Sequence, residues 1–174
     1  MIRVDDFVMP GSPAWWICLG LSLFGRSCDL GSTYAGTPNL VLEGNPFAKR
    51  LGWRLGIPLN LGLCLMIAAL PMMAISLATS SLLVAARNLQ SVWLMRTMGE
   101  FRYRQWMSEQ VSETPILTLL GCFWGESGLT ALVGLPLVIF SDWELVPFAV
   151  GCGIMIYGVL VAFFTTLGVW RRRF

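Results

Sequence analysis

Residues 147–170 read PFAVGCGIMIYGVLVAFFTTLGVW, and Arg171, Arg172 and Arg173 follow them directly. This uncharged stretch exceeds the roughly 20 apolar residues that cross a bilayer. The whole chain of 174 residues is 56% hydrophobic and 13% charged, whereas soluble domains average about 25% charged residues. The sequence therefore predicts an all-α integral membrane protein with a single domain, residues 1–174.

Four transmembrane helices are predicted, and a helix outside the membrane is expected in each of two connections. The spans are residues 13–35, 58–84, 116–140 and 147–170. The second is longer than one crossing and contains Pro71, which predicts a tilted or kinked helix. Asn45 and Pro46 predict the start of a short helix on the outer interface, because Asn caps helices and Pro suits the first helical position. Residues 85–113 mix arginines with aromatic residues, which predicts a cytoplasmic interfacial helix between spans two and three.

The distribution of lysine and arginine predicts the orientation of the chain. One side carries Arg3, Arg87, Arg96, Arg102, Arg104 and Arg171 to Arg173, and the other side carries Lys49, Arg50 and Arg54. Because cytoplasmic loops carry an excess of basic residues, we expect a protein of the inner (plasma) membrane of a prokaryote with both termini in the cytoplasm.

Cysteine and histidine usage gives no indication of a metal or cofactor. The five cysteines lie singly in apolar stretches without C-x-x-C spacing, and the chain contains no histidine. Separate cysteines of this kind are typical of small core residues, and histidine is the commonest metal ligand. We expect neither a disulfide framework nor a bound cofactor.

Two charged residues, Arg26 and Asp29, fall inside the first predicted span. Ionisable groups at this depth cost roughly 2.5–3.5 kcal/mol each on insertion scales and usually pair or serve a function. The two are one helical turn apart and can pair with each other. Counting 1.5 Å per residue instead puts Arg26 roughly 20 Å and Glu126 roughly 17 Å along their spans. This near match predicts an intramembrane ion pair between Arg26 and Glu126, which leaves Asp29 facing the outer connection.

The remaining polar residues of the first hairpin predict a ligand site open to the outer side of the membrane. Carboxylates, hydroxyls and amide oxygens are hard ligands that suit a cation, an amine or a polyol. The predicted ligand-binding residues are Asp29, Ser32, Thr33, Glu43, Asn45 and Asn60.

The pattern Asp29-x-x-Ser32-Thr33 followed by Glu43-x-Asn45-Pro46 and a second apolar span resembles a family of small uncharacterised prokaryotic membrane proteins. The likeness covers residues 24–70, the first helical hairpin. Members of that family often carry a lysine early in the second span, where this chain has Asn60. The resemblance implies a shared site and names no reaction.

Three functions from different classes are consistent with these residues. The first is a small transporter or channel-like protein that binds or conducts a cation or small polar solute, and the second is an accessory subunit of a larger membrane complex. The third, an intramembrane lipid-modifying enzyme that uses Asp29 and Glu43, lacks a nucleophile with a neighbouring base. An enzyme is therefore the least favoured of the three.

The expected partners follow from the charged and small residues. We expect the lipid bilayer itself and anionic lipid headgroups or a partner protein at a basic surface formed by Arg87, Arg96, Arg102 and Arg104. No nucleic acid partner is expected. Gly121, Gly125 and Gly128 in the third span, with Gly151 and Gly158 in the fourth, predict close helix packing inside the chain, with a homo-oligomer as the alternative.

Overall fold

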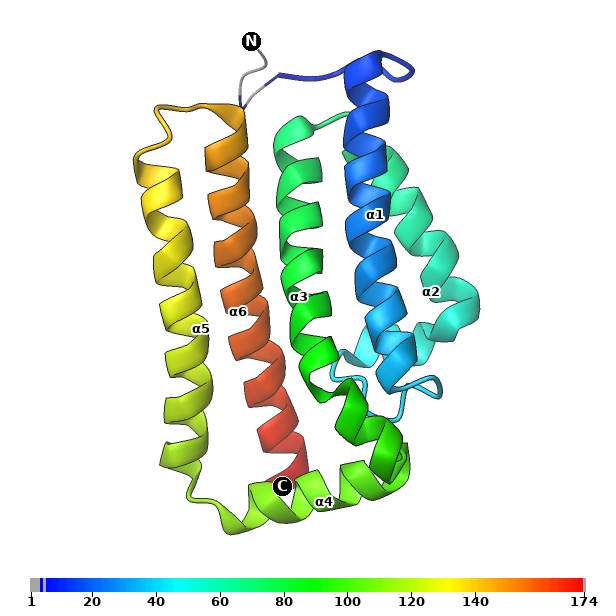
Figure 1. Ribbon diagram of the computed structural model, residues 1–174, viewed down its shortest axis with the longest axis vertical. Helices are drawn as coiled ribbons and strands as arrows, with labels where there is room; N and C mark the ends of the chain where they lie inside the picture. The colour runs from blue at the N-terminus through cyan, green and yellow to red at the C-terminus, as the bar shows by residue number, and fades with distance from the viewer. Residues whose placement is uncertain (1–3, 5, 174) are drawn as a thin grey trace.

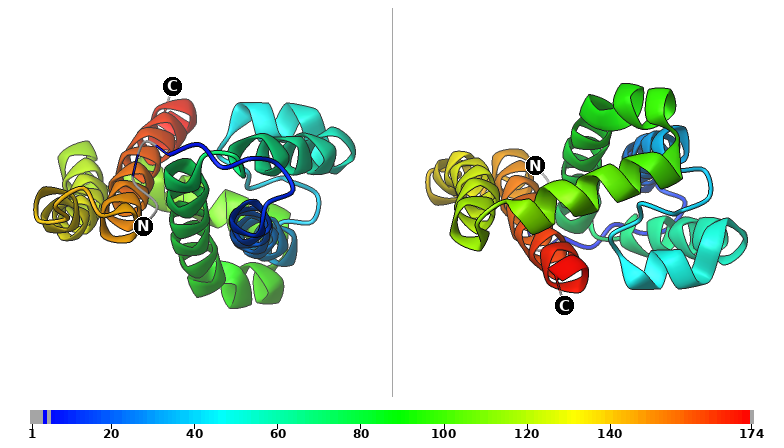
Figure 2. Two further views of the ribbon diagram at one scale, coloured as in Figure 1. Left: turned by 90° about the horizontal axis from the view of Figure 1, so that it is seen from above. Right: turned by 90° about the horizontal axis from the view of Figure 1, so that it is seen from below.

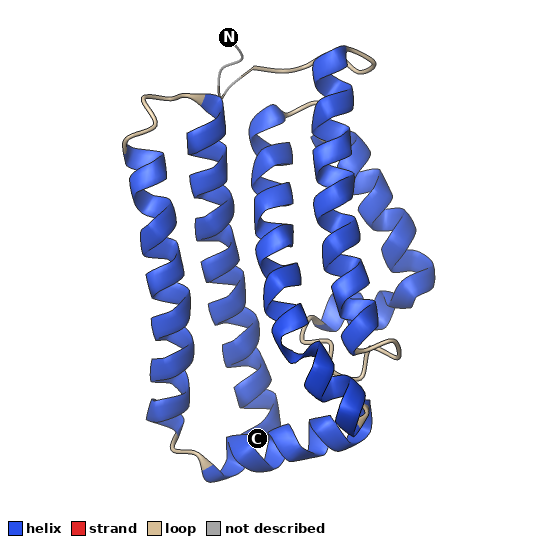
Figure 3. Ribbon diagram, viewed as in Figure 1, coloured by secondary structure: helices blue, strands red, loops and turns tan. Residues whose placement is uncertain are grey.

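The computed structural model describes residue 4 and residues 6–173, and all regular structure in that part of the chain is helical (Figure 3). The helices are α1 (Pro13–Gly36), α2 (Pro46–Ile67), α3 (Pro71–Met98), α4 (Glu100–Glu113), α5 (Ile116–Ile139) and α6 (Leu145–Arg173). The prediction of an all-α protein is confirmed.

Four long helices form a row in the order α1, α3, α6 and α5 (Figure 1). α2 lies outside the row and packs on α1 and α3, while α4 crosses one end of the bundle, as the end views in Figure 2 show. α3 is the central element because it packs against both α1 and α6.

The starts of the first two helices follow from local sequence. The Ser12 side chain accepts a hydrogen bond from the Trp15 amide, and the Asn45 side chain accepts one from the Phe47 amide. A proline occupies the first helical position after each cap, where its missing N–H is not needed. The predicted helix start at Asn45 and Pro46 is confirmed. Gly52 has φ +62° and ψ −173°, so the first turns of α2 form a short segment bent away from the rest.

The prediction of one kinked span over residues 58–84 is wrong. α2 ends at Ile67, the chain reverses through Ala68, Ala69 and Leu70, and α3 starts at Pro71. The reversal is stabilised because Ala68 and Ala69 are buried and the Val8 amide donates to the Ala69 carbonyl at 2.9 Å. Pro71 therefore begins a helix instead of bending one.

The predicted interfacial helix is shorter than residues 85–113. α3 continues to Met98, and Gly99, with φ +78°, changes the chain direction before α4 begins. Glycine adopts this left-handed backbone without the steric cost that a Cβ imposes. The prediction of a separate helix between two spans is confirmed for α4, whereas residues 85–98 belong to a long helix of the bundle.

Three helices of the described chain, rather than four, are long and apolar enough to cross a membrane: α3, α5 and α6. They fit a membrane protein. α1 falls short because its second half contains Arg26, Asp29 and several small polar residues. The start of α1 and the end of α6 lie at opposite ends of the bundle (Figure 1), whereas the sequence prediction has both termini on one side of the membrane; the side of each terminus stays a prediction. The extra reversal before Pro71 accounts for the difference, and Arg3 lies outside the described residues.

Glycines allow close approach at three helix crossings. A Cβ added at Gly25 would lie 2.8 Å from the Ala78 Cα of α3, and one added at Gly134 would lie 2.6 Å from the Gly151 carbonyl oxygen of α6. Gly153 likewise meets the Ser76 carbonyl oxygen. In contrast, a Cβ at Gly121, Gly125 or Gly128 would meet nothing within 4 Å. The predicted internal packing is therefore wrong for those three glycines. It is confirmed for Gly151 and Gly158 of α6, where an added Cβ would lie 2.7 Å and 2.8 Å from carbonyl oxygens of α5.

Candidate functional site

The centre of the candidate site is the guanidinium of Arg26, which joins three helices. It donates to the Asp29 carboxylate of its own helix at 2.5 Å, to the Asn60 side-chain oxygen of α2 at 2.8 Å from Nε, and to Ser81 Oγ of α3 at 3.4 Å. The Asn60 amide group donates in turn to the Gly56 carbonyl at 2.8 Å. Each polar group thus has a partner, which lowers the cost of placing a charge within the bundle.

A second polar contact lies further along α1. Asn88 of α3 donates from its side-chain amide to Ser32 Oγ at 3.2 Å and to Thr33 Oγ1 at 3.1 Å. Ser32 is buried, and its hydroxyl also donates to the Asp29 carbonyl at 2.8 Å. The contact holds the polar half of α1 against α3.

The connection between α1 and α2 places Glu43 and Asn45 beside these groups. The Asn45 amide donates to the Glu43 carboxylate at 2.8 Å, while the Asn45 side chain caps α2. Trp53 donates from its indole nitrogen to the Pro38 carbonyl at 2.7 Å and holds the connection against α2.

The same connection is attached to α4 by the buried carboxylate of Glu100. Thr37 Oγ1, the Asn39 amide and the Asn39 side chain donate to it at 3.0 to 3.1 Å, and the Val41 amide donates at 3.4 Å. Burial acts to raise the pKa of Glu100, but these hydrogen bonds outweigh it and hold the pKa below the ordinary value of 4.5. Glu100 is therefore the anionic acceptor that closes the loop.

Arg26, Asn88 and part of the connection between α1 and α2 line one cavity of about 780 Å³ between α1, α2, α3 and α6. All six residues of the predicted ligand site contribute to its wall: Asp29, Ser32, Thr33, Glu43, Asn45 and Asn60. A cavity of this size matches the sites that take small molecules, which range over about 300–1,000 Å³. The structure thus brings the predicted residues together, and binding itself stays a prediction.

The predicted ion pair between Arg26 and Glu126 is wrong. Arg26 pairs with Asp29, and Glu126 pairs with Arg87 of α3 at 2.5 Å. α3 and α6 stand between α1 and α5 (Figure 1), so matching depth does not bring Arg26 to Glu126. Arg87 consequently does not belong to the predicted basic surface, because it lies in the bundle helix α3 and lines the cavity.

The other arginines of that surface, Arg96, Arg102 and Arg104, are exposed near the junction of α3 and α4. They remain a predicted contact for anionic headgroups or a partner.

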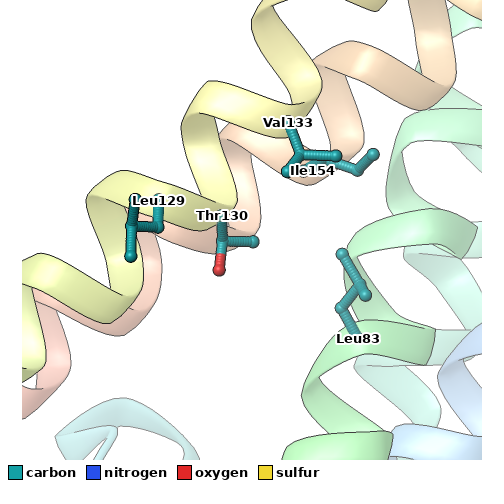
Figure 4. Close-up of a pocket in the computed structure, with 5 residues that line it drawn as sticks. All are labelled: Leu83, Leu129, Thr130, Val133 and Ile154. Atoms are coloured by element: carbon teal, nitrogen blue, oxygen red, sulfur yellow. The ribbon is translucent and has the colours of Figure 1, made fainter.

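A second hollow, of about 320 Å³, lies between α3 and α5 with α6 beside it (Figure 4). It is apolar apart from one hydroxyl, and its lining residues are Leu83, Leu129, Thr130, Val133 and Ile154. With no charged group in its wall, it lacks the means to select a polar ligand.

Sequence reasoning missed three polar contacts of the site: Ser81, Asn88 and Glu100. Ser81 and Asn88 lie in α3, and Asn88 is one residue from Arg87, so a polar break in a long helix was the available signal. Glu100 gave no such signal, because it sits among other charged residues of a surface helix. Among the described residues, no three His, Cys, Asp or Glu side chains form a group that could hold a metal ion.

No protein-family model, curated protein or solved structure matches this chain.

Proposed function

We propose that the protein is an integral membrane protein that binds a cation or a small polar solute in the cavity around Asp29. The observation that supports this best is that residues separated in sequence, from Asp29 to Asn88, surround one cavity and hold each other by hydrogen bonds.

The charges of the cavity favour a positively charged ligand. Arg26 is neutralised by Asp29, and Arg87 is neutralised by Glu126. Among the described residues, Glu43 takes part in no ion pair although it lies in the cavity wall. One carboxylate therefore remains to attract a cation.

We further propose that the chain lies in a prokaryotic inner membrane with the α4 end in the cytoplasm. The start of α2, the end of α3, α4 and the end of α6 lie toward that end (Figure 1), and they carry Lys49, Arg50, Arg54, Arg96, Arg102, Arg104 and Arg171. The opposite end carries the acids Asp142 and Glu144 in the turn before α6. The positive-inside rule then puts the connection beside the cavity on the cytoplasmic side, rather than on the outer side.

A second candidate, a subunit of a larger membrane complex or a homo-oligomer, is favoured by the exposure of α5. Only 6% of its most apolar window is buried within the chain, and its Gly121, Gly125 and Gly128 meet no neighbour. Native purification tests this candidate: a stoichiometric partner, or a stable dimer of this chain, is the expected result.

Thermal stabilisation tests the binding function. The purified protein in mild detergent is heated with sodium, potassium, butylamine or glycerol, and the melting temperature is recorded for wild type, Asp29→Asn and Glu43→Gln. A ligand at 100 times its Kd stabilises a protein by about 2.7 kcal/mol, so one of these solutes should raise the wild-type melting temperature by a few degrees and should act less on both variants. Asp142→Asn, which changes an exposed acid at the other end, serves as the control. Equal responses in all four proteins would exclude the proposed site.

A further inference from the structure

The wall of the 780 Å³ cavity has two chemically different parts. One part is the polar group around Arg26, Asp29, Asn60 and Glu43. The other is an apolar surface that α2 and α6 supply from opposite flanks, with Leu59, Leu63 and Met66 on α2 and Leu160, Val161 and Phe164 on α6. A small hydrated ion would use only the polar part.

The cavity opens sideways between α2 and α6. α2 packs on α1 and α3 and makes no extensive contact with α6. Leu59 and Met66 are 56% and 70% exposed, and Leu160 is 40% exposed, although all three line the cavity. These residues therefore form its rim. In a bilayer a rim of leucine and methionine faces lipid tails, so a ligand can enter from the membrane.

The polar part lies beside this rim and not beyond it. Asn60 follows Leu59 directly on α2, and its side-chain oxygen accepts from Arg26. A molecule whose chain rests on Leu59 and Leu63 thus brings its head to the level of Arg26 and Asp29. The charged residues of the wall are Arg26, Asp29, Glu43 and Arg87. Arg26 pairs with Asp29, and Arg87 pairs with Glu126, which lies outside the wall, so Glu43 is the wall charge without an ion-pair partner among the described residues.

We infer that the cavity takes an amphiphile with a single alkyl chain and an amine headgroup, which enters between α2 and α6. The headgroup lies between Glu43 and Asp29, and the chain lies against the apolar surfaces of α2 and α6. This inference rests on the proposed binding function and specifies its ligand class.

Three matched probes test it. Dodecylamine carries both the amine and the long alkyl chain, butylamine carries the amine with a short chain, and dodecanol carries the long chain without the amine. The protein is reconstituted in phosphatidylcholine nanodiscs, and the affinity for each probe is taken from the rise of the melting temperature with concentration. Dodecylamine should bind at least about ten times more tightly than either of the other probes when affinities are compared at equal probe concentration in the nanodisc membrane.

Two variants on α2 separate the cavity from simple partitioning into the bilayer. Leu59→Trp places a large ring at the rim, while Leu65→Trp makes the same change at a residue that is 45% exposed and does not line the cavity. Dodecylamine affinity should fall about tenfold in Leu59→Trp and stay unchanged in Leu65→Trp. Glu43→Gln should remove the preference for dodecylamine over dodecanol.

The outcomes distinguish this inference from the proposed function. If butylamine binds as tightly as dodecylamine and Leu59→Trp binds both normally, the ligand is a small cation, and the inference fails while the proposed function stands. If no probe responds to Glu43→Gln or Asp29→Asn, both fail. Equal losses in Leu59→Trp and Leu65→Trp would show a general effect of the ring on α2 and would also overturn the inference.

Discussion

Replacing Glu100 by glutamine should release the connection between α1 and α2 without unfolding the bundle. Glu100 is 9% exposed and accepts hydrogen bonds from Thr37, from the backbone and side chain of Asn39, and from the Val41 amide. Glutamine has nearly the same shape but offers only one acceptor oxygen. Its NH₂ group would face the N–H and O–H donors that now bind the second carboxylate oxygen. The perturbation is therefore confined to one polar contact.

The size of the effect follows from the number and charge of these bonds. Hydrogen bonds to a charged group contribute about 1.5–3 kcal/mol each, and a buried donor left without an acceptor costs about 1–3 kcal/mol. Losing the charge and one of the two acceptor oxygens should destabilise the closed connection by about 2–4 kcal/mol. Amides whose hydrogen exchange requires this connection to open should therefore exchange roughly 30 to 900 times faster.

Hydrogen exchange of the Asn39 and Val41 amides measures this opening directly. Glu109→Gln is the control, because Glu109 is an exposed acid of the same helix whose carboxylate accepts from Gln105 within α4. It should leave the exchange of both amides unchanged. Equal protection of Asn39 and Val41 in wild type and Glu100→Gln would refute the reasoning.

The pH dependence of the same exchange has a defined sign. Because the pKa of Glu100 is held below 4.5 in the folded protein, its stabilisation is fully present above about pH 4.5 and is lost as the pH falls through the folded pKa. Once corrected for the intrinsic exchange rate, protection should be constant at neutral pH and fall below that range in wild type. Glu100→Gln should show no such fall.

Three other perturbations have definite expected results. Asp29→Asn should lower the melting temperature, because the loss of one partner leaves the Arg26 guanidinium without its carboxylate, which costs about 3–5 kcal/mol for a buried pair; unchanged stability would show that the pair is fully hydrated. Gly134→Ala should destabilise the protein by about 1–3 kcal/mol, because the added Cβ would lie 2.6 Å from a carbonyl oxygen of α6, whereas Gly128→Ala meets no atom within 4 Å and should be neutral or slightly stabilising in thermal unfolding. A cysteine at Asp142 in an otherwise cysteine-free chain should react with an impermeant maleimide added to intact cells, and a cysteine on the exposed face of α4 should react only after lysis; the reverse pattern would invert the proposed orientation.

The sequence predicted the helical class and the polar residues of the cavity because both depend on composition. Asp29, Ser32 and Glu43 are conspicuous in an apolar chain, and proximity along the chain already places them near one another. The reversal before Pro71 could not be recognised by hydropathy, since Ala68 and Leu70 are as apolar as the helices they join. A turn normally shows polar residues, but in this one Ala68 and Ala69 are buried and the backbone forms its hydrogen bonds within the protein.

The partners of the buried charges could not be predicted for a related reason. Counting residues along each helix places Arg26 and Glu126 at nearly the same depth, but it does not show whether their two helices are neighbours. Which helices are neighbours depends on the number of reversals, so the missed turn also assigned Arg87 to a surface instead of to Glu126.

The hydrogen bonds of Arg26 have a consequence for the order in which the protein enters the membrane. Asp29 emerges from the ribosome soon after Arg26, but Asn60 and Ser81 are synthesised about 34 and 55 residues later. Until then α1 carries a charged pair whose other donors have no acceptor in the bilayer, and α1 is not among the helices that are apolar enough to cross a membrane. We therefore expect α1 to enter lipid only together with α2 and α3, with the later pair, α5 and α6, joining these three helices afterwards.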